Sequence, residues 1–260
     1  MKHFFKPRAS GLLMTAMLFA GGSQTALALG TASNTTISNT ATVNYEVGSV
    51  AQTAVLSSPD GLTPTGVATD FLVDNKVDVT VAASDVTYVQ VAPGSVAQVL
   101  TYTVTNEGNT AQDFILTATP GADPFGGTDN FNATTANVFV ESGANAGYQA
   151  GQDVAVYIDE LAPTTIATPL SATVYVVSAI DAGQVNGDIA AYTLTANAAD
   201  AGVAATLGAE TTATVGADTA GVDVVLADGA DDTDSANAGD SSDTSAYQIA
   251  TASLAVAKVS

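Results

Sequence analysis

The chain lacks most of the side chains that carry out chemistry at neutral pH. It has no Cys and no Trp among 260 residues, and its single His and single Arg lie within the first 28. Beyond residue 28 the cations are Lys76 and Lys258, and all 26 acidic residues lie there, which leaves a formal charge of −24. The absence of Cys excludes disulfides and thiol nucleophiles, and the absence of His removes the usual general base. We therefore expect a non-enzymatic protein and nominate no catalytic residue.

The nearest approach to a catalytic motif is a pair of short acidic turns. Asp218-Thr219-Ala220 and Asp234-Ser235-Ala236 resemble the Asp-Thr/Ser-Gly turn of aspartic proteases, but Ala stands where the Gly is needed. A Ser–Lys dyad would need a desolvated lysine, and Lys76 falls on the polar side of an alternating segment. Both observations favour a protein without catalysis.

Residues 1–28 are predicted to be a signal peptide. A basic start is followed by an apolar run at 11–20 and by Ala26-Leu27-Ala28, a small-residue cleavage site. The apolar run is shorter than the roughly 20 residues that span a bilayer. We expect a secreted protein that begins near Leu29, lies outside the cell or on its surface, and has no integral membrane segment after cleavage.

The excess of acidic residues predicts which partners the mature chain avoids. Each contact with a phosphate would lack a cation and add like-charge repulsion, which argues against nucleic acid and against an anionic membrane. Cations are the natural counterpart of such a surface.

Apolar and polar residues alternate along most of the mature chain, which predicts β-strands. In 37–47 the odd positions include Ile37, Val43, Tyr45 and Val47 and the even positions are polar, so we expect a half-buried strand. Further strands are expected at 73–81, 87–91, 98–105, 113–119, 137–140, 154–158, 172–178, 190–196, 209–215 and 247–259. Gly, Asn, Asp and Pro clusters between them predict turns. Many short strands favour an all-β, antiparallel Ig-like β-sandwich, with a jelly-roll-like variant or two joined sandwiches as alternatives.

Composition divides the mature chain into segments. Residues 29–56 form an N-terminal strand region, 57–69 is a Pro- and Gly-rich linker, and 70–215 is the sandwich body. Residues 216–246 are an acidic Gly/Ala/Asp-rich loop, and 247–260 is a C-terminal strand. Both ends are therefore expected to be strand-like and able to detach from the body.

Five sequence motifs together resemble those of a known group of surface proteins. They are TTISNTATVNYEVGSVAQT, VLTYTVTNEGNTAQDFIL, VFVESGANAGYQAGQDVAVYIDELAP, VNGDIAAYTLTANA and ATVGADTAGVDVVLAD, which cover nearly the whole mature chain. This ordered set is similar to secreted bacterial surface proteins with DUF11-type immunoglobulin-like repeats. The resemblance implies an Ig-like fold and a surface or matrix role, with no enzymatic activity attached.

Calcium is the cofactor that the residue types favour, because it takes oxygen ligands from carboxylates, amides and backbone carbonyls. The run ESGANAGYQAGQD is similar to a calcium-binding turn, with Glu141, Asn145 and Asp153 as candidate ligands. The acidic residues between 218 and 243 are a further candidate region. Other candidate ligands flank turns or strand ends, and they are Asp123, Asp129, Asp159 and Glu160. For each, the alternative is ordinary turn chemistry, in which Asp or Asn accepts hydrogen bonds from backbone amides.

The strand at 37–47 precedes a linker, which is the arrangement needed to complete a neighbour's sheet. Donor and acceptor surfaces differ in such a contact, so it can propagate into a filament. The C-terminal strand is the alternative donor, and pairing of both strands inside their own sandwich is the alternative to donation. We predict a structural homopolymer, a self-assembling subunit of an extracellular filament, surface layer or biofilm matrix joined by β-strand complementation.

The rival prediction is a monomeric adhesin or glycan-binding sandwich, whose partner is a cell-surface glycan or another matrix component. Tyr88, Phe125, Tyr148 and Tyr157 would present aromatic rings for binding. Because Trp is absent and aromatic residues make up 6% of the chain, few rings are available for sugar stacking. The sequence favours the structural role.

Overall fold

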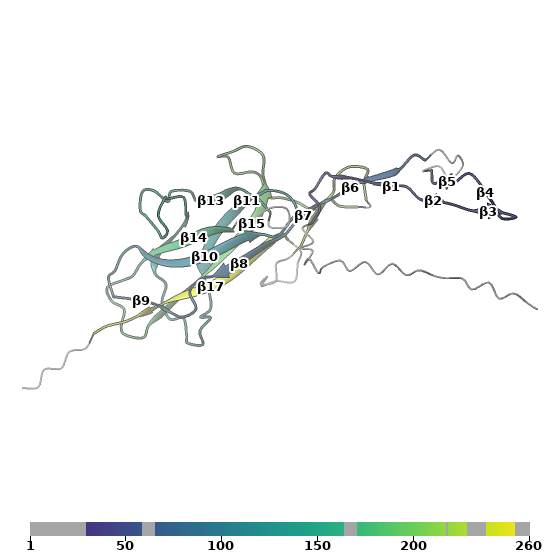
Figure 1. The fold of residues 1–260 in the computed structure, drawn as a ribbon. Coiled ribbons are helices and arrows are strands. Elements are labelled where there is room, and N and C mark those ends of the chain that lie inside the picture. The colour runs from purple at the N-terminus through teal and green to yellow at the C-terminus, as the bar shows by residue number, and fades with distance from the viewer. Residues whose placement is uncertain (1–29, 59–65, 164–170, 217, 228–237, 253–260) are drawn as a thin grey trace, which may run out of the picture.

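The computed structural model describes residues 30–58, 66–163, 171–216, 218–227 and 238–252. Within these ranges the protein is all-β, as predicted. Two sheets form a sandwich, and a narrow two-stranded arm extends from one end of it (Figure 1). The described residues include no helix that is long and apolar enough to cross a membrane. The predicted signal peptide lies outside the described residues.

The first sheet has four antiparallel strands. In spatial order they are β12 (Thr134–Val140), β14 (Ser171–Ala179), β10 (Gln98–Asn106) and β8 (Val79–Ala83). In β10 the side chains alternate between buried and half-buried from Leu100 onward, as a strand with one face on the core requires.

The second sheet has five strands. In spatial order they are β13 (Tyr157–Leu161), β11 (Gln112–Pro120), β15 (Ile189–Asp200), β17 (Asp240–Ile249) and β9 (Val89–Val91). All neighbours are antiparallel except β9 and β17, which are parallel. The β8-β10-β14-β12 sheet matches the ABED order of an Ig sandwich, and β17-β15-β11 matches its other sheet. The described residues therefore form one Ig-like sandwich; the sequence predicted this fold and left open whether one or two sandwiches are present.

Tyrosines bind the two sheets to each other across the core. The Tyr102 hydroxyl donates to the Tyr192 carbonyl at 2.6 Å, and the Tyr247 hydroxyl lies within hydrogen-bonding distance of the carbonyls of Gln98 and Val176. Burial raises the pKa of both Tyr102 and Tyr247 far above the ordinary value of 10.0, so both remain neutral donors. Each bond links a side chain of one sheet to a carbonyl of the other.

The arm is a single long β-hairpin. Its paired segments are β1 (Thr36–Asn39) with β6 (Thr69–Leu72), β2 (Thr42–Val43) with β5 (Val55–Leu56), and β3 (Glu46–Val47) with β4 (Val50–Ala51). At the tip Gly48 and Ser49 have φ of 58° and 68°, the left-handed pair that a two-residue type I′ turn requires. This turn returns the chain along the first strand and so produces the arm.

Asn109 fixes the arm to the sandwich. Its side-chain amide donates to the carbonyls of Asp74 (2.8 Å) and Thr31 (3.2 Å), and its Oδ1 accepts from the Lys76 amide at 2.8 Å. Next to it, β7 (Asn75–Val77) pairs in parallel with β16 (Val224–Leu226) and leads directly into β8. The segment that enters the arm and the segment that leaves it are therefore both hydrogen-bonded to the Asn109 side chain.

The structure corrects two predictions about the N-terminal region. The strand at 37–47 is not half-buried, because it pairs with the returning arm strand and not with the sandwich. Residues 57–69 do not connect the arm to the body, because β6 after them still pairs with β1. They lie within the returning strand of the arm, between β5 and β6, and 59–65 within them lie outside the described residues.

Three further strand predictions are also corrected. Residues 209–215 form no strand and make only one isolated bridge, between Glu210 and Ala199. The strand predicted at 154–158 is β13, which begins three residues later. The C-terminal strand begins at Asp240, inside the segment predicted to be a loop, while 228–237 and 253–260 lie outside the described residues.

Candidate functional site

The arm carries an apolar face that nothing in the described structure covers. Val43, Tyr45 and Val47 alternate along one strand and so share a face, and cross-strand pairing places Val55 beside Val43 and Val50 beside Val47. Their exposed fractions are 59% for Val43, 46% for Tyr45, 61% for Val47, 63% for Val50 and 41% for Val55. A two-stranded hairpin alone is marginally stable in water. An arm of this composition is therefore expected to gain stability from a partner.

The edges of the arm also lack the usual protection against pairing. Residues 36–56 contain no Pro and no Lys, and their one charged residue is Glu46. Natural edge strands are commonly blocked by charges, Pro or a covering element. The arm therefore presents both an apolar face and open backbone edges.

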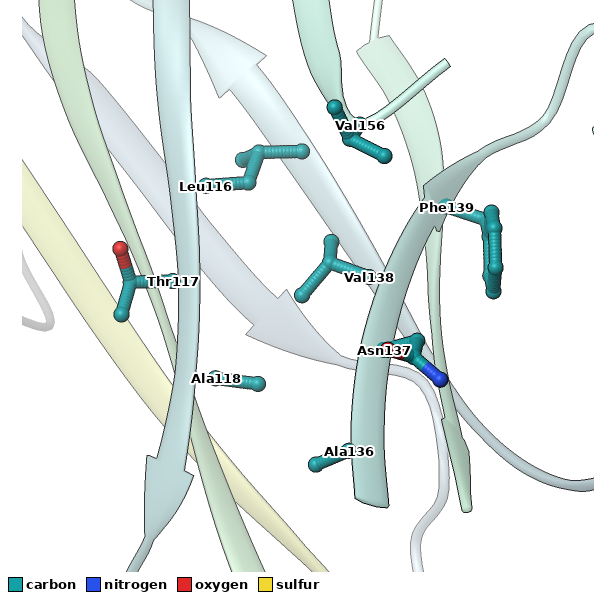
Figure 2. Close-up of a pocket in the computed structure, with 8 residues that line it drawn as sticks. All are labelled: Leu116, Thr117, Ala118, Ala136, Asn137, Val138, Phe139 and Val156. Atoms are coloured by element: carbon teal, nitrogen blue, oxygen red, sulfur yellow. The ribbon is translucent and has the colours of Figure 1, made fainter. Parts of the chain in front are cut away.

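A groove runs between β11 and β12, where the edges of the two sheets meet. Its volume is about 460 Å³. Figure 2 shows Leu116 and Ala118 of β11 pointing toward Ala136 and Val138 of β12, with Val156 at the rim. The floor side chains are only partly buried, and Val156 is 57% exposed. The complete lining is Leu116, Thr117, Ala118, Ala136, Asn137, Val138, Phe139 and Val156.

The groove is open because β13 covers only part of β11. Their register pairs Ile115 with Tyr157 and ends there, so on this side no strand of the described residues pairs with 116–120. The chain just before β13 turns toward the other sheet, where the Val140 amide donates to the Ala155 carbonyl at 2.9 Å. Among the described residues, β12 also has one strand neighbour only, which is β14.

Two other edges of the sandwich, those of β8 and β13, are protected. On β8, the Val81 amide donates to Ser241 Oγ at 3.1 Å and the Ala83 amide donates to Asp243 Oδ2 at 2.6 Å. The outer edge of β13 carries Asp159 and Glu160, whose charges oppose pairing with another acidic chain. The β11/β12 side differs because no charged residue lines it.

Two of the predicted calcium ligands at 141–153 lie close together, but they bind backbone amides. Glu141 accepts hydrogen bonds from the Gly143 and Gly147 amides and from the Tyr175 hydroxyl at 2.7 Å. Burial and this carboxylate raise the pKa of Tyr175 to about 12. Asn145 is exposed on the same loop. The structure thus provides the alternative role, turn stabilisation, and calcium at this loop stays a prediction.

Asp153 gives this loop a pH dependence. Its carboxylate accepts from the amides of Gln149 (2.6 Å), Ser142 (3.0 Å) and Gly143 (3.2 Å). These donors, Gln149 first, lower the pKa of Asp153 below the ordinary 3.8. The stabilisation is complete above that ordinary value and is lost as pH falls through the lowered pKa. A carboxyl-carbon NMR titration should show Asp153 protonating below pH 3.8; protonation at or above it would contradict these bonds.

The other predicted ligands are dispersed. Asp123 accepts from the Tyr88 hydroxyl at 2.6 Å and from the Phe125 amide at 2.9 Å. Asp129 accepts from the Ala191 amide at 3.2 Å, and Asp159 accepts from the Ala205 amide at 2.9 Å. Glu160 lies beside Asp159 on β13. The structure does not bring these four acidic residues together with Glu141 and Asp153.

One acidic cluster lies at the base of the arm, and it joins two residues of the predicted candidate region 218–243 to Asp74, which the sequence analysis missed. Carboxylate oxygens of Asp74, Asp218 and Asp223 lie within 4.8 Å of one another, the one such group in the described residues. The Asp223 amide donates to Asp74 at 3.0 Å, and Thr219 donates to Asp223 through its hydroxyl and amide, which lowers the pKa of Asp223. Asp74 is distant in sequence from the other two, so no local motif indicates the cluster. Hydrogen bonds account for its geometry, and calcium here stays a prediction.

The aromatic rings named for ligand binding mostly pack on one another. Tyr88 and Phe125 meet edge to face with centroids 5.0 Å apart, and Tyr148 packs between Phe139 (5.3 Å) and Tyr175 (6.0 Å). Tyr157 is partly buried in β13. Rings engaged in this way do not form a flat exposed platform for sugars.

Comparisons with protein-family models, with curated proteins and with solved structures gave no match for this chain. The resemblance to DUF11-type proteins therefore stays an interpretation of motifs.

Proposed function

We propose that this chain is a non-enzymatic, secreted structural subunit that polymerises with copies of itself. The product would be an extracellular filament, surface layer or biofilm matrix of a bacterium, joined by β-strand complementation through the N-terminal arm. The supporting observation is the arm itself, whose face of Val43, Tyr45, Val47, Val50 and Val55 is exposed.

Energetics support a partner for this face. Burying one Val side chain that would otherwise be exposed contributes about 1.5–3 kcal/mol, and several such side chains lie side by side here. Open backbone edges add main-chain hydrogen bonds to any strand that pairs with them. A second copy of the chain would receive the arm and present its own, so the contact would repeat.

The arm is favoured over the C-terminal strand as the donor. In the sandwich β17 pairs with both β15 and β9, and Tyr247 in it is fully buried. Donating β17 would open the core, whereas the arm can pair with another subunit without disturbing either sheet.

The first test is negative-stain electron microscopy of purified mature protein, residues 29–260. Regular filaments or sheets are expected as the concentration rises, and sedimentation should show large species under the same conditions. Dispersed monomers at every concentration, with and without calcium, would overturn the proposal and favour the monomeric adhesin.

Charge leads to a prediction about ions. Subunits that each carry −24 repel one another when closely packed, unless salt screens them or divalent cations bridge them. We expect assembly to strengthen when calcium or about 0.15 M salt is added and to weaken in chelator at low ionic strength, as measured by light scattering. Magnesium at equal ionic strength separates a specific calcium effect from screening. Identical assembly in chelator at low salt would contradict this prediction.

A further inference from the structure

We propose that the acceptor for the arm is the β11/β12 groove of a second copy of this chain, with the arm's apolar face lying on the groove floor. This inference rests on the proposed function and deepens it by naming the surface that receives the arm. The floor of the groove is formed by Leu116, Ala118, Ala136 and Val138. The arm face that would cover it includes Val43, Tyr45 and Val47.

The groove offers what an added strand needs. It is flanked by two backbone edges with which no strand of the described residues pairs, 116–120 of β11 and the outer edge of β12 before Val140, whose amide donates to Ala155. Arm residues 43–47 and β11 residues 116–120 have the same length, about 16 Å at roughly 3.3 Å per residue. Alternate side chains of such a strand would point to the floor while its backbone pairs with an edge.

The arm and the groove are both poor in charged residues. The chain has 26 acidic residues, yet 36–56 contains only Glu46 and the groove lining contains none. Two copies of so acidic a chain repel least where neither surface is charged. The approach of the arm to the groove is thus opposed by few like charges.

A second copy is the occupant, and the arm of the same chain is not. The hairpin extends away from the sandwich, and its tip at β3 and β4 is the part farthest from it (Figure 1). Hydrogen bonds from Asn109 to Asp74 and Thr31 hold the base in this direction. Reaching its own groove would require the arm to fold back, whereas a second subunit can be reached in the conformation observed.

Because the chain has no Cys, single cysteines can locate the contact. We would mix two differently tagged proteins, Val47→Cys in the arm and Val138→Cys in the groove, under assembling conditions and oxidise them. The matched control replaces Val138→Cys with Val185→Cys, which is 63% exposed and lies outside the groove. We expect at least tenfold more mixed disulfide with Val138→Cys than with the control.

Three other cross-linking results would point to a different acceptor or a different occupant of the groove. If the proteins assemble but Val138→Cys links no better than the control, the groove is not the acceptor while the structural role stands. A monomeric internal disulfide in the Val47→Cys/Val138→Cys double variant would assign the groove to the chain's own arm. Preferential linking of Val138→Cys to Lys258→Cys would assign it to the C-terminal segment. Each of these overturns the inference, and failure of the unsubstituted protein to assemble overturns both proposals.

Ala136→Asp provides a second measurement that does not need a disulfide. A carboxylate on the partly buried floor should prevent the arm from docking, because it would be desolvated without a partner. We expect this variant to assemble at least tenfold less readily than Val185→Asp, while its circular dichroism matches that of the unsubstituted protein. Equal assembly of two folded variants would count against the groove.

Discussion

Replacing both Val43 and Val47 with Asp raises the concentration at which the subunit assembles by about a hundredfold or more. Both side chains lie on the exposed apolar face of the arm, so assembly would bury them. Losing about 1.5 kcal/mol or more at each position gives about 3 kcal/mol, which corresponds to a factor of at least 100 in affinity. Sedimentation velocity over a dilution series measures the shift.

The matched control is Val185→Asp with Val203→Asp, which adds the same charge at two exposed positions outside the arm and the groove. We expect this control to assemble almost as readily as the unsubstituted protein. The thermal unfolding of both double variants should be unchanged, because none of the four side chains lies in the core. Equal assembly of the two variants would exclude the arm face as the contact.

The sandwich was predictable because its main strands follow the two-residue alternation closely. The expected strand at 98–105 is β10 (Gln98–Asn106), and the expected strand at 172–178 is β14 (Ser171–Ala179). In the predicted alternation at 73–81, Val77, Val79 and Val81 are all fully buried. Alternation identifies these strands since one face of each lies on the core and the other faces outward.

The first part of β17, before Tyr247, escaped prediction because it is polar. Ser241 and Ser245 are buried, and their hydroxyls hydrogen-bond inside the protein, with the Val81 amide and with Asp85. A buried serine that is satisfied in this way looks, in the sequence, like part of a loop. The acidic residues around these serines also favour the prediction of a loop.

The arm was only half predictable. Alternation at 37–47 identifies an amphipathic strand, but periodicity does not say whether a sheet, a hairpin or a second molecule covers its apolar face. Gly48-Ser49 between Val47 and Val50 is the local signal that could have revealed the hairpin, because Gly favours the left-handed turn.

The groove depends on register, which the sequence does not show. A strand at 154–158, as predicted, would continue the observed pairing of Tyr157 with Ile115 and cover Leu116 to Ala118. The observed β13 begins at Tyr157 and leaves this stretch open. A displacement of three residues therefore creates the surface on which the inferred contact depends.

Replacing Tyr247 with Ala should lower the free energy of unfolding by about 3–5 kcal/mol, the usual cost of removing a large buried aromatic side chain. Tyr247 is fully buried, packs against Tyr192 at 6.4 Å between centroids, and reaches the carbonyls of Gln98 and Val176 with its hydroxyl. Chemical denaturation followed by circular dichroism measures the change.

Two further variants separate the stability of the fold from assembly. Tyr247→Phe keeps the ring but removes the one hydroxyl proton that the carbonyls of Gln98 and Val176 share, so we expect a cost of about 1–3 kcal/mol. Tyr45→Ala removes the same side chain from the arm, where it is 46% exposed, and should change unfolding by less than about 0.5 kcal/mol while weakening assembly. Opposite effects at the two tyrosines would separate β17, which the fold requires, from the arm, which is free to be donated. If Tyr247→Ala costs less than about 1 kcal/mol, β17 is not integral to the core, and the C-terminal strand again becomes a candidate donor.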